Sequence, residues 1–402
     1  MSYKEKVVVL VGSYKTIPPC DSSYPGIVDL IYRPVELMPD IDIKVVSLWQ
    51  DRLKAISFDK NKYFHSKREN LLFRFIPYRI RKKILGVGDA NRFCYYMGMI
   101  LLVQKIKPTK IIVHVDSGLA EKVKEFFPRA EVMFYYHGSI LEQKFNEESW
   151  KEFVGRIDKF VFICHDQVQK LEKKFGVLPK KYRVILNAIP ALPEISSDSL
   201  QQERMNCRKK YGLSQEHVLV IYAGRITKGK NLHALVSSFI QAYRGNSQLR
   251  LIIAGDPARE TYGDFEYFST LKELSEQLPS GVIQFPGWLS RNDLARLYSV
   301  ADIAVLLSTP EEGEGNSLFL MESMANGLAC VATEVGGNKE VLAETGVLLP
   351  SEEVLSRLPS VLITLASDRE YRFRLGHAAL QRARGYFTYE RVAKELREFI
   401  MS

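Results

Sequence analysis

Two glutamates eight positions apart, Glu314 and Glu322, stand beside the predicted start of a helix. The stretch EEGEGNSLFLMESMANG, residues 311–327, combines a glycine-rich loop with an apolar run at helical spacing. Asn316 or Ser317 is a natural N-cap there, where free backbone N–H groups and the helix dipole attract anions. Taken alone, the stretch reads more simply as an acidic surface loop followed by an ordinary helix.

A second group of side chains supplies positive charge. The stretch YAGRITKGKNL, residues 222–232, ends a predicted strand at Gly224 and offers Arg225, Lys228 and Lys230 before the next predicted helix. Arginine gives planar bidentate hydrogen bonds and lysine acts as a point charge, so the group suits a diphosphate. Basic residues are also common in surface loops, so this group too is weak evidence by itself.

Together and in this order, the two groups resemble the retaining glycosyltransferases of the GT-B fold, family 4. The pattern runs from Gly224 and Arg225 to Lys230, continues with Glu314 and Glu322, and ends in CVATEVGG, residues 330–337. The resemblance covers most of residues 215–350 and is looser elsewhere.

The resemblance implies a role for each matched residue. Arg225 and Lys230 would hold the diphosphate of the donor and stabilise its charge as the nucleotide leaves. Glu322 would bind the ribose hydroxyls, and Glu314 would contact the transferred sugar near the anomeric centre. The other donor-binding residues implied are Gly26, Gly224, Gly255, Asp256, Trp288, Gly315, Asn316 and Ser317.

Some of these positions have other readings or depart from the family pattern. Trp288 is equally well explained as a packing residue. The family often has two glycines before the first helix, whereas SSYPG keeps only Gly26, preceded by the unusual stretch 16–24. How the donor is covered there stays open.

The acceptor side of the resemblance nominates His137. It lies in YYHGS, residues 135–139, after a predicted strand, and is similar to the H-G or H-D of the family. A lone histidine is more often structural, but a place at the carboxyl end of a strand favours function. His114 and Asp116 follow another strand in a similar position, with less support.

The elements that must position these residues alternate between short apolar strands and amphipathic helices. This alternation predicts parallel sheets covered on both faces. The fold class expected is α/β, with two doubly wound Rossmann-like domains facing a central cleft. The expected boundaries are an acceptor-side domain over 1–190, a linker over 191–205, a donor-nucleotide domain over 206–370, and a helical tail over 371–402 that packs back toward the first domain.

Composition and charge narrow the kind of partner, the kind of site and the compartment that we expect for this protein. Residues 1–190 carry 33 Lys and Arg against 21 Asp and Glu, whereas the rest of the chain carries 23 against 26. The first half therefore suits an anionic partner. Five scattered cysteines without a C-x-x-C pair argue against a disulfide framework and against a zinc site. No run of about 20 apolar residues spans a bilayer, and no signal peptide is recognisable, so we expect a cytoplasmic protein.

The resemblance implies a retaining, metal-independent transfer with no cofactor beyond the nucleotide-diphosphate sugar. Uridine diphosphate sugars are a common donor in the family. We expect a glycan, lipid-linked or wall-polymer acceptor, in the synthesis of surface polysaccharide, glycolipid, or cell-wall or spore glycan. The rivals are a catalytically silent surface-layer scaffold of the same fold and a sugar-nucleotide epimerase. No nucleic-acid motif is present, and we expect no nucleic-acid partner.

A basic and aromatic segment, KRENLLFRFIPYRIRKK, spans residues 67–83 with seven Lys or Arg and one Glu. Apolar side chains interleaved with cations suit contact with an anionic membrane surface. The alternative is a solvated basic helix whose aromatic side packs on the sheet, and Pro77 would interrupt a long helix. We therefore expect a cytoplasmic protein that is peripheral at the inner face of a membrane if the first reading holds.

Overall fold

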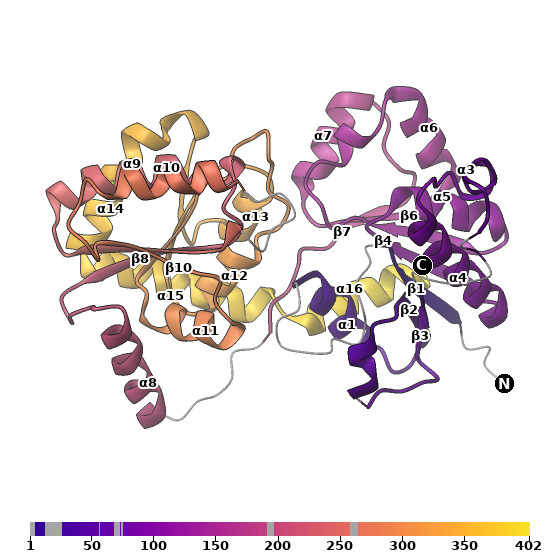
Figure 1. Cartoon of the computed structure of the whole chain (residues 1–402), viewed down its shortest axis with the longest axis horizontal. Coiled ribbons are helices and arrows are strands. Elements are labelled where there is room, and N and C mark those ends of the chain that lie inside the picture. The colour runs from indigo at the N-terminus through magenta and orange to yellow at the C-terminus, as the bar shows by residue number, and fades with distance from the viewer. Residues whose placement is uncertain are drawn as a thin grey trace. The chain divides into compact units, whose positions relative to one another are not determined.

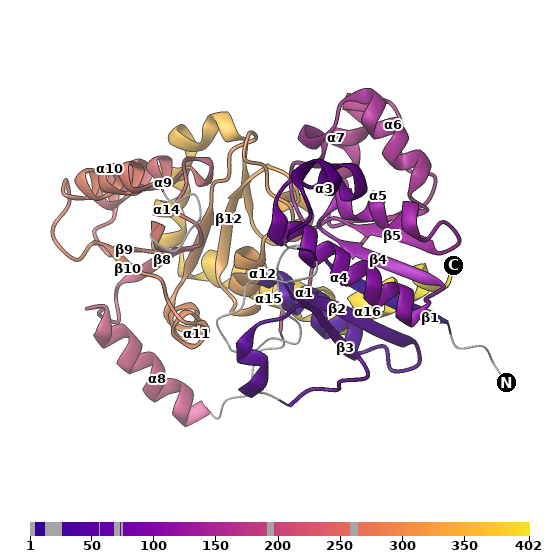
Figure 2. The ribbon, with the colours of Figure 1, turned by 45° about the vertical axis from the view of Figure 1, so that its right-hand side comes forward.

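The computed structural model describes residues 5–12, 26–55, 57–67, 73, 75–190, 197–257 and 264–402. The chain divides into two units (Figures 1 and 2). Unit 1 comprises Met1–Leu186 and Tyr389–Ser402, and unit 2 comprises Asn187–Thr388. Each unit is built around one parallel sheet, as the alternation of strands and helices predicts. The expected α/β fold class is thus confirmed.

Unit 1 contains a seven-stranded sheet in the order β3-β2-β1-β4-β5-β6-β7. All neighbouring strands pair in parallel. The strands are β1 (Lys6–Val11), β2 (Asp42–Leu48), β3 (Tyr63–Ser66), β4 (Lys110–His114), β5 (Glu131–Tyr135), β6 (Lys159–Phe162) and β7 (Tyr182–Val184). The helices are α1 (Gly26–Glu36), α3 (Tyr78–Leu85), α4 (Ala90–Ile106), α5 (Ser117–Phe126), α6 (Glu147–Arg156), α7 (His165–Phe175) and α16 (Tyr389–Met401).

The strands of unit 1 are apolar because helices cover both faces of the sheet. In β1, KVVVLV, every residue after Lys6 is buried. Val8 and Leu10 join one core cluster with residues of α4, α5, α6 and α7. Helices α1 and α16 pack against each other and bury their apolar sides, for example at Ile31 and Leu396.

Unit 2 contains a six-stranded sheet in the order β10-β9-β8-β11-β12-β13, again parallel. The strands are β8 (Val218–Ala223), β9 (Leu249–Ala254), β10 (Ile283–Gly287), β11 (Ile303–Leu306), β12 (Ala329–Thr333) and β13 (Val347–Leu349). The helices are α8 (Ser197–Lys210), α9 (Leu232–Gly245), α10 (Phe265–Ser275), α11 (Arg291–Val300), α12 (Leu318–Ala325), α13 (Asn338–Leu342), α14 (Val354–Ser367) and α15 (Arg369–Tyr386). Helix α9 packs with α10 and α14, and α12 packs with α15 (Figure 1).

The helical tail expected over 371–402 is divided between the two units. Helix α15 packs on β12 and α12 in unit 2, and α16 belongs to unit 1. The segment 191–205, expected to be a linker, contains the start of α8 at Ser197. Residues 191–196 lie outside the described part of the chain.

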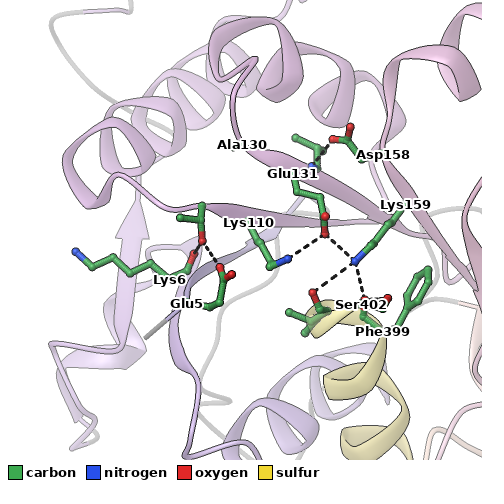
Figure 3. A network of polar contacts seen from close by, with 12 residues as sticks. Glu5, Lys6, Lys110, Ala130, Glu131, Asp158, Lys159, Phe399 and Ser402 are labelled. Carbon is green, nitrogen blue, oxygen red and sulfur yellow. Dashed lines mark hydrogen bonds and ion pairs between the residues drawn. The ribbon is translucent and has the colours of Figure 1, made fainter. Parts of the chain in front are cut away.

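Helix α16 is held at the amino edge of the unit 1 sheet by a polar network (Figure 3). Lys159, the first residue of β6, is fully buried and donates from Nζ to the carbonyl oxygen of Phe399 at 2.9 Å. The same Nζ lies 2.9 Å from Oε1 of Glu131, which also pairs with Lys110 at 3.5 Å. A cation suits this place because the carbonyls at a helix C-terminus carry partial negative charge.

Three further expectations concern the basic segment 67–83, the cysteines and membrane-spanning helices. In the segment 67–83, helix α3 begins only after Pro77, and residues 68–72 and 74 lie outside the described ranges. Four cysteines, Cys94, Cys164, Cys207 and Cys330, are buried and form no disulfide with one another, whereas Cys20 lies outside those ranges. Among the helices that the structure describes, none has the length and apolar character needed to cross a bilayer.

Candidate active site

The predicted donor-binding loops of unit 2 lie at the carboxyl edge of its sheet. The chain leaves β8 for β9 on one side, while β11 lies on the other side of β8. Loops that follow the two central strands of such a sheet diverge, and ligands of open α/β sheets bind there. One of these loops carries Arg225 and Lys230, and the other carries Glu314.

Lys230 and Glu314 form a buried ion pair. Nζ of Lys230 lies 2.6 Å from Oε2 of Glu314, although the two residues are 84 positions apart. Ser308, which follows β11, is buried and donates from Oγ to the same carboxylate oxygen at 2.7 Å. Lys230 also donates to Ser308 Oγ at 3.2 Å. The lysine side chain is 11% exposed, so its charge lies just beneath the surface of the site.

Arg225 faces a different carboxylate. Its Nη2 lies 3.0 Å from Oε1 of Glu312, and the arginine side chain is 48% exposed. The two loops also meet through their backbones, because the amide of Thr309 donates to the carbonyl of Gly229 at 2.8 Å. A Cβ at Gly229 would lie 2.4 Å from Cβ of Glu312, so this contact requires a glycine.

Glycines also allow the loops to approach at two other places. A Cβ at Gly255 would lie 2.2 Å from the carbonyl oxygen of Gly224. Gly336 has φ +57, and a Cβ there would lie 1.8 Å from the carbonyl oxygen of Glu314. The next amide, that of Gly337, donates to this carbonyl at 3.0 Å. The glycine pair at 336–337 therefore fixes the backbone from which the Glu314 side chain extends.

Helix α12 begins as the sequence predicts, with Ser317 as its N-cap. Ser317 Oγ accepts from the amide of Leu320 at 3.3 Å. Asn316 is buried, and its side-chain oxygen accepts from the amide of Asn187 at 2.8 Å. Its Nδ2 has no hydrogen-bond partner among the described residues. Asn316 therefore holds residue 187 against the start of α12.

Glu322 lies one turn into α12 and faces Tyr298 of α11. The hydroxyl of Tyr298 donates to Oε2 of Glu322 at 3.1 Å. Burial, followed by the charge of Glu322, raises the pKa of the Tyr298 hydroxyl well above its usual value. The tyrosine is therefore a permanent hydrogen-bond donor that orients this carboxylate.

The remaining predicted donor-binding residues lie at the edges of the site or in the other unit. Asp256 follows β9, and Trp288 follows β10 with 41% of its surface exposed. Gly315 is buried in the loop before α12. Gly26 is the first residue of α1 in unit 1. The unusual stretch 16–24 lies outside the described residues.

His137 belongs to unit 1, where it is paired with His114. Nδ1 of His114, at the end of β4, lies 2.8 Å from Nε2 of His137 after β5. The two rings are stacked with centroids 5.1 Å apart. Burial lowers the pKa of His137 to about 3 and that of His114 well below its usual value, so both rings are neutral at pH 7. His137 Nδ1 is buried and has no hydrogen-bond partner among the described residues.

A strained turn holds His114 in place. Val115 has φ +74, and the amide of Asp116 donates back to the carbonyl of His114 at 2.9 Å, forming a γ-turn. A β-branched residue with positive φ is an outlier, and such strain tends to gather at functional sites. Gly12 makes room for this turn, because a Cβ there would lie 2.5 Å from Cβ of Asp116.

The arrangement in unit 2 can bind a diphosphate and orient a sugar beside it. Cationic groups and a helix start provide charge, and two oriented carboxylates can accept hydrogen bonds from hydroxyl groups. Sequence reasoning did not use Ser308, Glu312 or Tyr298, which have no motif of their own. It named His114 but gave it less weight than His137, because the pairing of the two becomes visible only when β4 and β5 are adjacent.

Comparisons with known proteins find similarity over the part of the chain that contains these residues. Residues 203–382 match the model of the family "Glycosyl transferases group 1", a range that includes Arg225, Lys230, Glu314 and Glu322. Over this range the chain is therefore similar to glycosyl transferases group 1.

Individual relatives and structures extend the likeness over more of the chain. The chain is 26% identical over 330 residues to spore coat protein SA of Bacillus subtilis strain 168, covering 79% of this chain and 85% of the relative. It is 24% identical over 293 residues to lipopolysaccharide 1,2-N-acetylglucosaminetransferase of Salmonella typhimurium strain LT2, covering 72% and 71%. The structure of Anabaena HepE in complex with UDP and glucose has a TM-score of 0.73 at 15% identity, covering 99% of each chain. These neighbours share the GT-B fold.

Proposed function

We propose that this chain is a retaining, metal-independent glycosyltransferase of family 4 that moves a sugar from a nucleotide-diphosphate sugar to a hydroxyl acceptor. The observation that carries the proposal is the cluster of Lys230, Glu314 and Ser308 beside Arg225, at the carboxyl edge of β8 and β11. This cluster also lies inside the range that matches the glycosyl transferase family model.

In the proposed reaction, the chain mainly stabilises charge. Arg225 and Lys230 bind the diphosphate, and the negative charge that develops as the bond to the anomeric carbon breaks is stabilised by these cations and by the start of α12. Glu314 accepts hydrogen bonds from the transferred sugar, and Glu322 accepts them from the ribose. The acceptor hydroxyl enters on the face from which the nucleoside diphosphate leaves, through an ion-pair-like state, and its proton passes to the leaving phosphate.

The proposed role of His137 is to orient the acceptor or the sugar through hydrogen bonds. Its low pKa keeps the ring neutral, so it neither repels the cationic transition state nor binds the diphosphate as a further cation beside Arg225 and Lys230. The hydrogen bond to His114 fixes the ring in one orientation.

The substrates are proposed by chemistry and by likeness. A uridine diphosphate sugar is the first donor to test, since the HepE structure of the same fold holds UDP and glucose. A glycan, lipid-linked or wall-polymer acceptor is the proposed second substrate, in keeping with a lipopolysaccharide glycosyltransferase among the relatives. We propose that the enzyme works at the inner face of a membrane and that the segment 67–83 contacts the membrane surface.

The test is a panel of nucleotide sugars, with release of nucleoside diphosphate as the readout. We expect slow donor hydrolysis without acceptor, faster release with acceptor, and equal rates in the presence of EDTA. An α-linked donor should give an α-linked product by proton coupling constants. A β-linked product would overturn the retaining mechanism.

The same panel separates the rival functions. A silent scaffold would bind a nucleotide sugar, or none, without turnover. A sugar-nucleotide epimerase would change the sugar with no net transfer to a hydroxyl acceptor. Loss of the rate in EDTA would overturn metal independence and leave the transfer itself standing.

A further inference from the structure

Unit 1 contains a polar cavity of about 460 Å³ that the proposed chemistry does not use. Three helices form its wall: the second half of α3, the first turns of α4 and the first turns of α5. Helix α5 begins directly after β4, at the carboxyl edge of the sheet, and Arg92 in the first turn of α4 contacts Asp116, the N-cap of α5. The cavity therefore lies at the edge of unit 1 where ligands of α/β folds bind.

The wall of this cavity is rich in cations. Lys82, Arg92 and Lys122 line it, one from each helix. Lys82 is exposed, whereas Lys122 also contacts Glu125 at 2.6 Å. The first turns of α4 and α5 add partial positive charge from their backbone amides. The cavity thus combines three side-chain cations with two helix starts.

Two acids share the wall, and two of its cations are also ion-paired: Arg92 with Asp116 at 2.7 Å and Lys122 with Glu125 at 2.6 Å. Asp89 is the N-cap of α4, and its Oδ1 accepts from the amide of Arg92 at 2.7 Å. Glu121 is half-buried, and burial raises the pKa of its carboxyl group. Among the described residues, Lys82 is the wall cation without a carboxylate partner, and an anion would compete with Asp116 and Glu125 for Arg92 and Lys122.

Two glycines shape the backbone between α3 and α4 at this wall. Gly86 ends α3 with φ +69, and its amide donates to the carbonyl of Lys82. A Cβ at Gly88 would lie 2.4 Å from the ring of Tyr78, so any larger residue would collide with that ring. Gly88 therefore lets the ring of Tyr78 pack directly against the backbone between α3 and α4.

The cavity is connected to the paired histidines through Asp116. Arg92 and Tyr96 line the cavity, and both contact Oδ2 of Asp116, the arginine at 2.7 Å. Asp116 caps α5 and ends the strained turn that begins at His114. A group bound in the cavity would thus lie one side chain away from the turn that positions His137.

Exposed apolar side chains accompany the cavity. Tyr78 and Ile80 on α3 are 57% and 48% exposed, and Phe75, just before the helix, is 81% exposed. Exposed aromatic and aliphatic groups beside cations suit the boundary between lipid headgroups and acyl chains. Within the segment 67–83, Lys82 therefore lines the cavity, while the apolar side chains named above are exposed on and just before the same helix.

We infer that this cavity binds the phosphate or diphosphate group of an amphiphilic acceptor, with Lys82, Arg92 and Lys122 as the ligands and the apolar part beside α3. The inference deepens the proposed function, since it names the acceptor as a phosphate-linked lipid, and it rests on that function for the word acceptor. The anion site itself is testable without any glycosyl transfer.

The first experiment measures pyrophosphate binding by calorimetry in the intact chain. Arg225→Ala and Lys230→Ala are introduced first, so that the proposed donor site does not contribute. In that background, Lys82→Gln with Lys122→Gln should weaken binding at least about ten-fold, since each charged hydrogen bond is strong. The matched control is Lys83→Gln with Lys105→Gln, which removes the same charge from α3 and α4 outside the cavity wall.

The control decides between a site and a general charge effect. Weakening in the wall variant alone supports the site. Equal weakening in both pairs, or no pyrophosphate binding in the background protein, would overturn it. Circular dichroism confirms that each variant is folded, and Arg92→Lys gives a second test that keeps the charge but loses the planar fork.

The second experiment identifies the source of the phosphate. Phosphatidylcholine vesicles with and without a polyprenyl diphosphate are sedimented with the chain. Retention that needs the diphosphate lipid, and that the wall variant loses, supports the amphiphile. Pyrophosphate binding without such retention would overturn the amphiphile and leave a site for soluble phosphates. Nucleoside diphosphate release by the unaltered chain is measured separately, so failure of the proposed function and failure of the cavity site give different results.

Discussion

Two buried lysines each form an ion pair with a glutamate, but one pair lies inside the fold and the other lies at the candidate active site. Lys159 in unit 1 and Lys230 in unit 2 each contact a glutamate, at 2.9 and 2.6 Å. Lys159 is at the amino edge of its sheet and also donates hydrogen bonds to carbonyl oxygens at the end of α16. Lys230 is at the carboxyl edge, where it also donates a hydrogen bond to the hydroxyl of Ser308.

The difference lies in position and access. Lys159 is completely enclosed, so no ligand can reach it, and its charge is balanced by groups of the chain itself. Lys230 keeps 11% of its side chain exposed at the edge where α/β sheets bind ligands. We therefore expect loss of Lys159 to damage the fold and loss of Lys230 to damage the chemistry.

The largest effect is predicted for Lys159→Ala. It leaves the carboxylate of Glu131 and the end of α16 without their buried cation, and breaking a buried pair costs about 3–5 kcal/mol. Urea unfolding followed by tryptophan fluorescence measures it, because Trp150 lies in the core of unit 1. Lys54→Ala is the control, since Lys54 pairs with Asp51 on the surface and should cost less than about 1 kcal/mol. Equal losses of unfolding free energy in the two variants would contradict a structural role for the buried Lys159 pair.

Lys230→Ala should reduce kcat/KM by roughly 30- to 1,000-fold, the equivalent of about 2–4 kcal/mol for one preorganised donor. Arg225→Ala should fall in the same range. Lys228→Ala is the matched control, because Lys228 is two positions away, 75% exposed and 3.5 Å from Asp264. Turnover near that of the unaltered chain in both Lys230→Ala and Arg225→Ala would remove them from the proposed mechanism.

The histidine pair extends the comparison to buried groups that contact no carboxylate in the described part of the chain. Because burial lowers the pKa of His137 to about 3, the folded chain resists a proton that the unfolded chain binds below about pH 6.5. Stability should thus be full above pH 6.5 and fall as the pH drops toward 3, by about 1.4 kcal/mol per pH unit for each such proton.

Urea unfolding at roughly pH 7.0 and 5.5 measures this slope, because the two conditions lie on either side of the pKa of about 6.5 that histidine has in the unfolded chain. A chain with His114→Gln and His137→Gln should show a smaller loss between the two conditions. His377→Gln is the control, because His377 is an exposed histidine of unit 2. An unchanged slope in the double variant would contradict the buried, neutral state.

The smallest effect is predicted for Glu312→Gln. The Arg225–Glu312 pair is partly exposed, and such pairs contribute about 0.2–1 kcal/mol. Its loss frees Arg225 for a diphosphate, so UDP should bind tighter by less than about five-fold. Glu311→Gln, at the neighbouring exposed position, is the control for overall charge. Weaker binding in Glu312→Gln would show that the carboxylate positions Arg225 for the ligand instead of competing for it.

Local sequence determined the elements and much of the candidate site. Alternating apolar strands and amphipathic helices specify a parallel sheet, since these patterns depend on neighbours a few residues away. The same is true of Ser317 as the cap of α12 and of the cations that follow β8. Pro77 marks the start of α3 for the same local reason, because it cannot continue a helix.

Tertiary structure alone decided which charged groups meet. Glu314 reaches Lys230 across 84 positions, and Lys159 reaches Phe399 across 240. In the sequence, Lys159 is one more basic residue, and only the docking of α16 turns it into a buried anchor. His114 and His137 likewise meet because β4 and β5 are adjacent. Such pairings are set by the balance of burial and desolvation over the whole unit, which no short pattern records.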